Sequence, residues 1–224
     1  MTEARRILTT HLEVTPRLAE LGLKAETLTE AARRGLNAYA SAVHTNYPRI
    51  FPGLFSWAES IRALGDMLAP SKWTRDEDRG QPLVVNANGE IAITVASGDE
   101  NTGKLGEDDP RTRSSKGPTT VQAISMNAWL IPEMEQDEKE RIGKKSKRRS
   151  TWWLLTFRDM DARELRCELS MPIGIDGKGI VRGWLERLIL KPISFDGAEF
   201  VLPQDDAPSG PQTGQITVEI KRRA

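Results

Sequence analysis

The fold of this chain is decided by the stretch Pro82-Leu83-Val84-Val85-Asn86-Ala87-Asn88-Gly89-Glu90-Ile91-Ala92-Ile93-Thr94-Val95. Two runs rich in strand-forming residues flank Asn88-Gly89. An Asn-Gly pair in that setting is the strongest short-range signal for a β-hairpin. We therefore expect antiparallel strands on either side of this pair, and a sheet that extends outward from them.

More strands are predicted downstream of the hairpin. Residues 151–157 form a second β-rich run, and from Leu165 to Ile175 apolar and polar residues alternate, which places the apolar ones on one face of a strand. Residues 180–195 fit both a strand and a helical stripe. A strand is favoured there because a turn sequence precedes the segment and Gly183 would weaken a helix. Residues 215–222 predict a last strand.

The first third of the chain is helical in character. Apolar residues at helical spacing predict helices over residues 27–46 and 56–68, with Pro48 and Pro52 ending the first of them. An earlier helical piece is expected over residues 6–21, interrupted near Pro16. A short helix is also expected over residues 119–131.

Together these patterns predict an α+β fold, in which a helical N-terminal third accompanies a mainly antiparallel β-sheet. The expected organisation is a helical subdomain over residues 1–75 and a β-rich domain over residues 82–222. Two long polar segments, 97–118 and 133–150, interrupt the sheet. The first of them is expected to be a long mobile loop.

Composition excludes several classes of protein. The chain has 224 residues, and its 32 basic residues balance 32 acidic ones, so net charge gives no global attraction to nucleic acid or membrane. The single cysteine, Cys167, excludes a disulfide framework within the chain and a cysteine-rich zinc site. No apolar run is long enough to span a membrane or to form a signal peptide. We predict a cytoplasmic protein with no membrane partner, and no cofactor or metal is predicted.

The most concentrated local charge suggests contact with nucleic acid. A basic run ends just before Trp152 and Trp153, which cannot both face the same side of a strand, so one of them is expected to be accessible. Cations bind phosphates and exposed aromatic rings stack on unpaired bases. The alternative is a solubilising loop, and the acidic residues 133–140 oppose binding. The candidate nucleic-acid-binding residues are Lys144, Lys145, Lys147, Arg148, Arg149 and Trp152.

Two motifs suggest enzymes, and both are incomplete. Residues 98–104 fit the Gly-x-x-x-x-Gly-Lys pattern of a phosphate-binding loop, but Leu105 replaces the hydroxyl residue that would hold magnesium, and no helix is predicted to follow. The Glu219-Ile220-Lys221 stretch, with Asp205 and Asp206 upstream, resembles part of a magnesium-dependent nuclease site. The alternative interpretation is an edge strand in which apolar and charged residues alternate and the charges are exposed to solvent.

Three smaller features leave their role open. The carboxylates of Asp159, Asp161, Glu164 and Glu168 form either a cation site or a solvated turn neutralised by neighbouring arginines. Cys167 lies among apolar residues of the predicted strand, which favours a buried thiol over a nucleophile. The polar residues at the end of the second predicted helix either line a pocket or satisfy the helix end: Ser41, His44, Asn46, Tyr47 and Arg49.

Three function classes follow from these observations. The leading one is a non-catalytic binding or accessory protein that contacts another macromolecule, with a protein as the expected partner. The second is a nucleic-acid-binding protein that uses residues 139–153. The third is a magnesium-dependent nuclease or phosphotransfer enzyme, so whether the chain is an enzyme is left open, with the balance against it.

Overall fold

The structure, a computed structural model of the chain, describes residues 6–43, 46–106, 108–129 and 149–195. Four α-helices and a mixed, mostly antiparallel eight-stranded sheet make up this part of the chain, in agreement with the predicted α+β class. None of the described helices is long and apolar enough to cross a membrane. In chain order the elements are β1 (Arg6–Leu8), α1 (His11–Glu20), α2 (Ala25–Val43), α3 (Phe51–Leu68), the 3-10 turn η1 (Ala69–Ser71), β2 (Thr74–Asp78), β3 (Gln81–Val85), β4 (Ile91–Ser97), α4 (Pro118–Trp129), β5 (Ser150–Asp159), β6 (Glu164–Pro172), β7 (Trp184–Ile189) and β8 (Ile193–Ser194).

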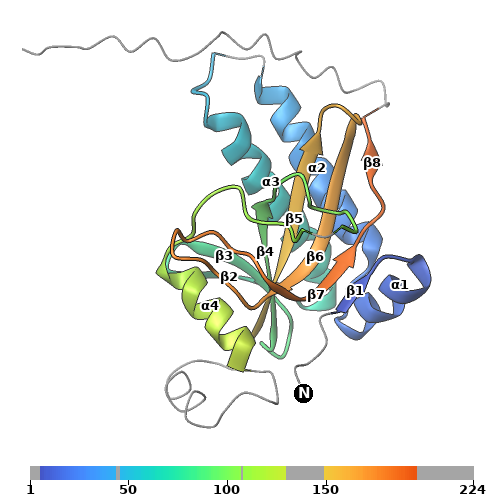
Figure 1. The fold of residues 1–224 in the computed structure, drawn as a ribbon, viewed down its shortest axis with the longest axis vertical. Coiled ribbons are helices and arrows are strands. Elements are labelled where there is room, and N and C mark those ends of the chain that lie inside the picture. The colour runs from blue at the N-terminus through green and yellow to red at the C-terminus, as the bar shows by residue number, and fades with distance from the viewer. Residues whose placement is uncertain (1–5, 44–45, 107, 130–148, 196–224) are drawn as a thin grey trace, which may run out of the picture.

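The sheet has helices on both of its faces. Its strand order is β1-β7-β6-β5-β4-β3-β2, and β8 pairs with β6. The pairs β4–β5 and β1–β7 are parallel, whereas the other pairs are antiparallel. Helices α2 and α3 pack on one face and α4 packs on the other (Figure 1).

The predicted hairpin is confirmed. Strands β3 and β4 pair with Val84 opposite Ile93, and Gly89 takes the left-handed φ of 79° that an Asn-Gly turn needs. The strand favoured for residues 180–195 is also confirmed, since β7 pairs with both β6 and β1. The strand predicted over residues 215–222 lies outside the described residues.

Two expectations about the elements are wrong, and one strand was not anticipated. Residues 6–8, expected to be helical, form an edge strand whose conformation is set by pairing with β7, a partner far away in the sequence. Helix α3 begins at Phe51 instead of Ser56, because Pro52 occupies the first helical turn, where its missing N–H costs nothing. Strand β2, which no pattern predicted, is fully exposed and charged, and it pairs with β3 at the sheet edge.

The segment expected to be a long mobile loop, residues 97–118, packs against the sheet instead. The backbone N–H of Gly98 donates to Thr156 at 2.9 Å, and that of Thr112 donates to Val181 at 3.1 Å. The indole Nε1 of Trp184 donates to the Pro110 carbonyl at 2.8 Å. These bonds connect the segment to residues far along the chain, so its polar composition reflects a hydrogen-bonded cover on the sheet.

The core lies on both sides of the sheet. The larger apolar cluster joins residues of α1, α2 and α3 to one face, including Trp152 and Cys167. A smaller cluster on the opposite face contains Trp153, Trp184 and Ile124 of α4. Helix α4 is further held by the buried Asn127 side chain, which bonds the backbone of Thr151 and the Pro172 carbonyl.

Candidate functional site

The most unusual surface of the described chain is the beginning of α3 with the turn that precedes it. Figure 1 shows the first turns of α3 beside the end of α2, at one end of the molecule and beyond the strands that the later turns of α3 cover. Because Pro52 permits an early helix start, these turns extend away from the sheet and carry large apolar side chains. We name this surface the aromatic tip, and it comprises Tyr47, Ile50, Phe51, Leu54 and Phe55.

Helical spacing arranges the aromatic tip in two rows. Tyr47, Phe51 and Phe55 are four residues apart, and their ring centroids are separated by 4.1 Å and 5.6 Å in succession. Ile50 and Leu54 form the second row, with 76% and 51% of their surface exposed. Tyr47 is 54% exposed. The stacked rings hold the first row in place, so the tip presents a preformed apolar surface to solvent.

The charge of the aromatic tip is also distinctive. From residue 46 to residue 58 the sequence contains one charged side chain, Arg49, and no carboxylate. Arg49 is exposed. An apolar surface with a single cation at its rim is typical of a binding site rather than of a solvated helix face.

Deep in the molecule, a polar cluster joins the 97–118 segment to the sheet. The guanidinium of Arg187 donates to the carboxylate of Glu168 at 2.6 Å, and both side chains have 0% exposure. Glu168 also accepts a hydrogen bond from Ser170 at 2.6 Å and one from the backbone N–H of Gly103 at 2.8 Å. Arg187 donates to the Lys104 carbonyl at 3.0 Å. This cluster is closed to solvent and holds the segment in place.

The same cluster explains why the phosphate-loop motif does not form a phosphate cradle. The amide of Gly103, which a phosphate would need, already donates to Glu168. The described residues between Lys104 and Pro118 form no helix, so no helix directly follows the loop as a phosphate cradle requires.

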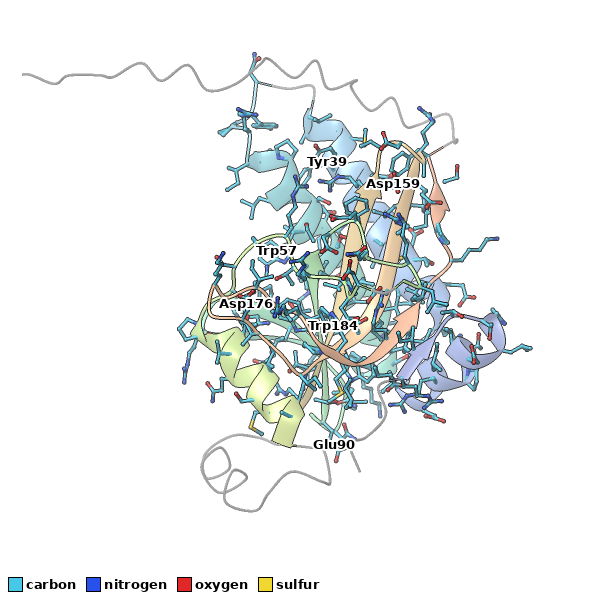
Figure 2. The ribbon with its side chains drawn as sticks, viewed as in Figure 1. Tyr39, Trp57, Glu90, Asp159, Asp176 and Trp184 are labelled. Atoms are coloured by element: carbon cyan, nitrogen blue, oxygen red, sulfur yellow. The ribbon has the colours of Figure 1, made fainter. Side chains whose placement is uncertain are left out.

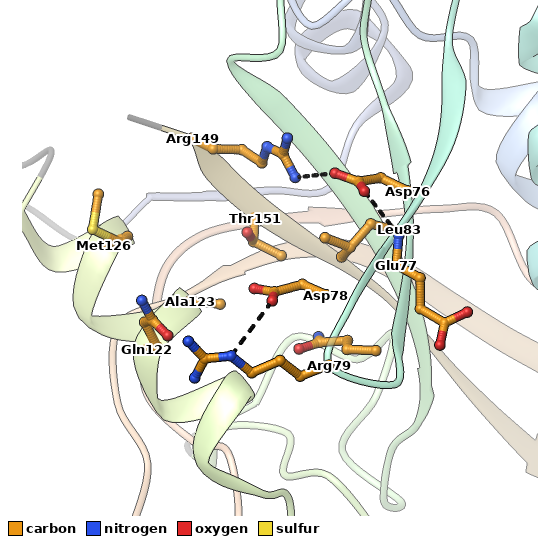
Figure 3. Close-up of a pocket in the computed structure, with 11 residues that line it drawn as sticks. Asp76, Glu77, Asp78, Arg79, Leu83, Gln122, Ala123, Met126, Arg149 and Thr151 are labelled. Atoms are coloured by element: carbon orange, nitrogen blue, oxygen red, sulfur yellow. Dashed lines mark hydrogen bonds and ion pairs between the residues drawn. The ribbon is translucent and has the colours of Figure 1, made fainter. Parts of the chain in front are cut away.

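The described residues also line several cavities. One, of about 320 Å³, lies between β2 and α4 and contains Asp76, Asp78 and Arg149 in its wall (Figure 3). A second, of about 440 Å³, opens at the carboxyl ends of β4 and β5. There Arg158 lies 3.8 Å from the ring centroid of Tyr39, which Figure 2 labels, and burial lowers the pKa of Arg158. Carboxylates and arginines share both cavities, so neither has a clear preference for ligand charge.

A third cavity, of about 260 Å³, lies where α4 begins. We name it the α4 pocket. Its wall contains Lys116, Thr119 and Trp153, together with Arg79 from the β2–β3 turn and Trp57 from α3. Sequence reasoning missed it because these residues come from four separate segments, although Lys116 directly before a predicted helix was a signal available in the sequence.

The predicted nucleic-acid-binding residues are only partly described. Lys144, Lys145, Lys147 and Arg148 lie outside the described residues. Arg149 donates to Asp76 at 2.9 Å, as Figure 3 shows, and its Nε donates to the Gly89 carbonyl at 3.2 Å.

The expectation of an accessible tryptophan is wrong. Trp152 is 2% exposed and Trp153 is 1% exposed, because the two faces of β5 are covered by different helices. Trp152 therefore offers no ring face to a base in this structure. Contact between the basic run and nucleic acid stays a prediction.

The other candidate residues are dispersed. Asp159 pairs with Arg166 at 3.1 Å, and Glu168 is committed to the buried cluster. Within the described part of the chain, no group of three His, Cys, Asp or Glu residues could hold a metal ion. Cys167 is fully buried, and burial raises the pKa of its thiol to about 12. Outside the described residues lie Asp205, Asp206, Glu219 and Lys221.

The polar residues at the end of α2 do not converge on a pocket. The Ser41 hydroxyl donates to the Ala38 carbonyl at 2.9 Å, which satisfies part of the helix end. Asn46, Tyr47 and Arg49 are exposed, and His44 lies outside the described residues.

Comparisons with known proteins do not indicate what this arrangement of residues does. No protein family, curated protein or solved structure matches the chain. The function is therefore argued from the arrangement of the described residues.

Proposed function

We propose that the chain is a non-catalytic binding protein that docks another protein through the aromatic tip. The observation that carries this proposal is the exposed, preformed apolar surface of Tyr47, Ile50 and Leu54, supported from behind by Phe51 and Phe55. Contiguous exposed apolar surface of this kind marks interaction sites in soluble proteins. Aromatic residues at the centre of such surfaces supply much of the binding energy.

The partner that fits this surface is a protein with an apolar groove and a carboxylate at its rim. The groove would take the side chains of Ile50 and Leu54, the exposed aliphatic residues of the aromatic tip. The carboxylate would face Arg49, the one charged residue of the segment from 46 to 58. Complementary charge at the rim of an interface sets orientation more than affinity.

Capture from cytoplasmic extract tests this proposal, because the lone cysteine and the expected localisation favour that compartment. The full chain is tagged and compared with an Ile50→Glu/Leu54→Glu variant, after nuclease treatment of the extract. Burial of an aliphatic side chain of this size contributes about 1.5–3 kcal/mol, so the double variant is expected to lose about a hundredfold or more in affinity.

The matched control is Leu12→Glu, because Leu12 is 87% exposed on α1, outside the aromatic tip. A partner that is retained by Leu12→Glu and lost by the double variant supports the proposal. A partner that both variants retain equally would contradict docking at the aromatic tip. Self-association of the purified chain that the double variant abolishes would identify a second copy as the occupant, and vesicle binding abolished in the same way would identify a lipid surface. Either result would contradict docking of a different protein at the aromatic tip.

A further inference from the structure

We propose that the α4 pocket is a binding site for a phosphate group, held by Lys116 and the N-terminus of α4. The charge of the cavity wall favours an anion. The wall contains the cations Lys116 and Arg79 and no carboxylate. The two cavities described above each contain at least two carboxylates, as does a fourth of about 370 Å³, whose wall contains Asp108 and Asp109. Among these four cavities, the α4 pocket is therefore the one whose wall favours an anion.

The charge of Lys116 also favours an anion in the cavity. Its ammonium lies 5.8 Å from the centre of the Trp153 ring and donates to the Ser114 hydroxyl at 3.1 Å. No described carboxylate forms an ion pair with it. Burial lowers the pKa of Lys116, which means that the charged form is short of compensation. An oxyanion in the cavity would supply that compensation.

The backbone holds Lys116 in this position. Its N–H donates to the Gly179 carbonyl at 2.7 Å. Gly179 has a φ of 77°, and a Cβ there would lie 2.9 Å from the Lys116 carbonyl oxygen. The contact between the two segments therefore requires glycine, and the lysine is preplaced at the cavity.

The N-terminus of α4 also borders the cavity. Helix α4 begins at Pro118, and Gly117, Thr119 and Thr120 all line the cavity. The positive end of the helix dipole and the first-turn hydroxyls therefore border the same space as Lys116. The first turn contains no acidic residue that would neutralise this end.

Trp153 has a hydrogen-bond donor without a partner. The Nε1 of Trp153 is buried and finds no hydrogen-bond partner among the described residues. By contrast, Trp57 Nε1 donates to the Val95 carbonyl at 3.1 Å and Trp184 Nε1 donates to Pro110 (both rings are labelled in Figure 2). Trp153 belongs to the wall of the α4 pocket, so the buried donor without a partner is part of a side chain that borders the cavity.

The test is titration of the full chain with inorganic phosphate at constant ionic strength, followed by calorimetry and tryptophan fluorescence. We expect saturable binding at one site. Lys116→Met should weaken it by at least about tenfold, because the charge-assisted contact of a half-buried lysine is lost. Lys24→Met is the control, since Lys24 is exposed and does not line the pocket.

Thr119→Glu provides a second variant that does not depend on the lysine. An acidic residue in the first helical turn favours the helix, so this variant is expected to fold, while its carboxylate excludes phosphate. Phenyl phosphate used in place of phosphate distinguishes two sources of the same group. A phosphomonoester should gain affinity from contact of its ring with the partly exposed Trp57 of the wall, whereas the free ion should not. Absence of saturable phosphate binding, or binding that Lys116→Met leaves unchanged, would overturn the proposal.

Discussion

The carboxylate of Glu168 and the guanidinium of Arg187 meet at 2.6 Å with neither side chain exposed. The two residues lie on neighbouring strands, and each also bonds the backbone of the 97–118 segment, through Gly103 and Lys104 respectively. This ion pair is the buried charged link between the sheet and the 97–118 segment, in addition to the hydrogen bonds of Gly98, Pro110 and Thr112. Removing one partner leaves the other charge buried and uncompensated.

Glu168→Ala is therefore expected to lower the free energy of unfolding by about 3–5 kcal/mol. Asp66→Ala is the matched control, because Asp66 pairs with Arg75 at a similar distance, 2.8 Å, but the two side chains are 49% and 53% exposed. An exposed pair contributes about 1 kcal/mol or less. Denaturant titration of both variants measures the difference, and equal losses would show that the buried pair has no special role.

The packing of α2 against α3 gives a second prediction. A Cβ added at Gly35 would contact the Ser60 hydroxyl and lie 2.7 Å from the Ser56 carbonyl oxygen, whereas at Gly53 it would meet nothing within 4 Å. Both positions are helical, so both variants gain the same intrinsic preference for alanine. We expect Gly35→Ala to destabilise the fold by about 1–3 kcal/mol and Gly53→Ala to leave it unchanged or slightly stabilised. Thermal unfolding compares them directly, and a stable Gly35→Ala protein would argue against this close helix contact.

The thiol of Cys167 is expected to be inert in the folded chain. Burial raises its pKa to about 12, and the thiolate is the reactive species. At neutral pH a thiol reagent therefore cannot reach the sulfur, and the sulfur is not in its nucleophilic form. The measurement is the rate of modification by a disulfide reagent in buffer and in guanidinium chloride. Modification should follow unfolding, and rapid reaction without denaturant would show that β6 is not covered as described.

Lys116 gives a prediction about pH. Its pKa in the folded chain lies below the ordinary 10.5, so between the two values the unfolded chain binds more protons than the folded one. Stability rises with pH wherever the unfolded state binds more protons. The free energy of unfolding of the natural chain, relative to that of Lys116→Met, should therefore rise with pH through this window. A constant difference would mean that the ammonium is well solvated.

Local signals in the sequence were enough for much of the fold. The Asn88-Gly89 hairpin and the alternation from Leu165 to Met171 depend on neighbours in the chain, and both appear as expected. The alternation does not continue to Ile175, because β6 ends at Pro172 and Ile175 packs with the cluster on the other face. Strand β1 was not predictable in this way, since its partner β7 is distant in sequence and imposes its conformation. Strand β2 pairs with its chain neighbour β3 across a two-residue turn, and it was missed because four of its five residues are charged. The burial of Glu168 was hidden because its partners are distant in sequence, and a charge is stable there only when Arg187 and the Gly103 amide are present.

The candidate sites were less predictable than the fold. Helical periodicity marks apolar residues at Ile50 and Leu54 but does not reveal that no described strand lies beneath them. The α4 pocket gathers Trp57, Arg79, Lys116 and Trp153 from separate segments, and no spacing rule connects them. The basic run was found by composition alone, and composition did not reveal that the neighbouring Trp152 is buried.

The central claim is that a partner protein covers the aromatic tip, and hydrogen–deuterium exchange of the captured complex tests it most directly. The first amides of a helix have no partner within the helix, so those at the start of α3 exchange quickly in the free chain and report sensitively on burial. We expect slower exchange in the complex than in the free chain for peptides covering residues 47–57, and unchanged exchange in α1. Unchanged exchange over residues 47–57, with protection elsewhere in the chain, would contradict it.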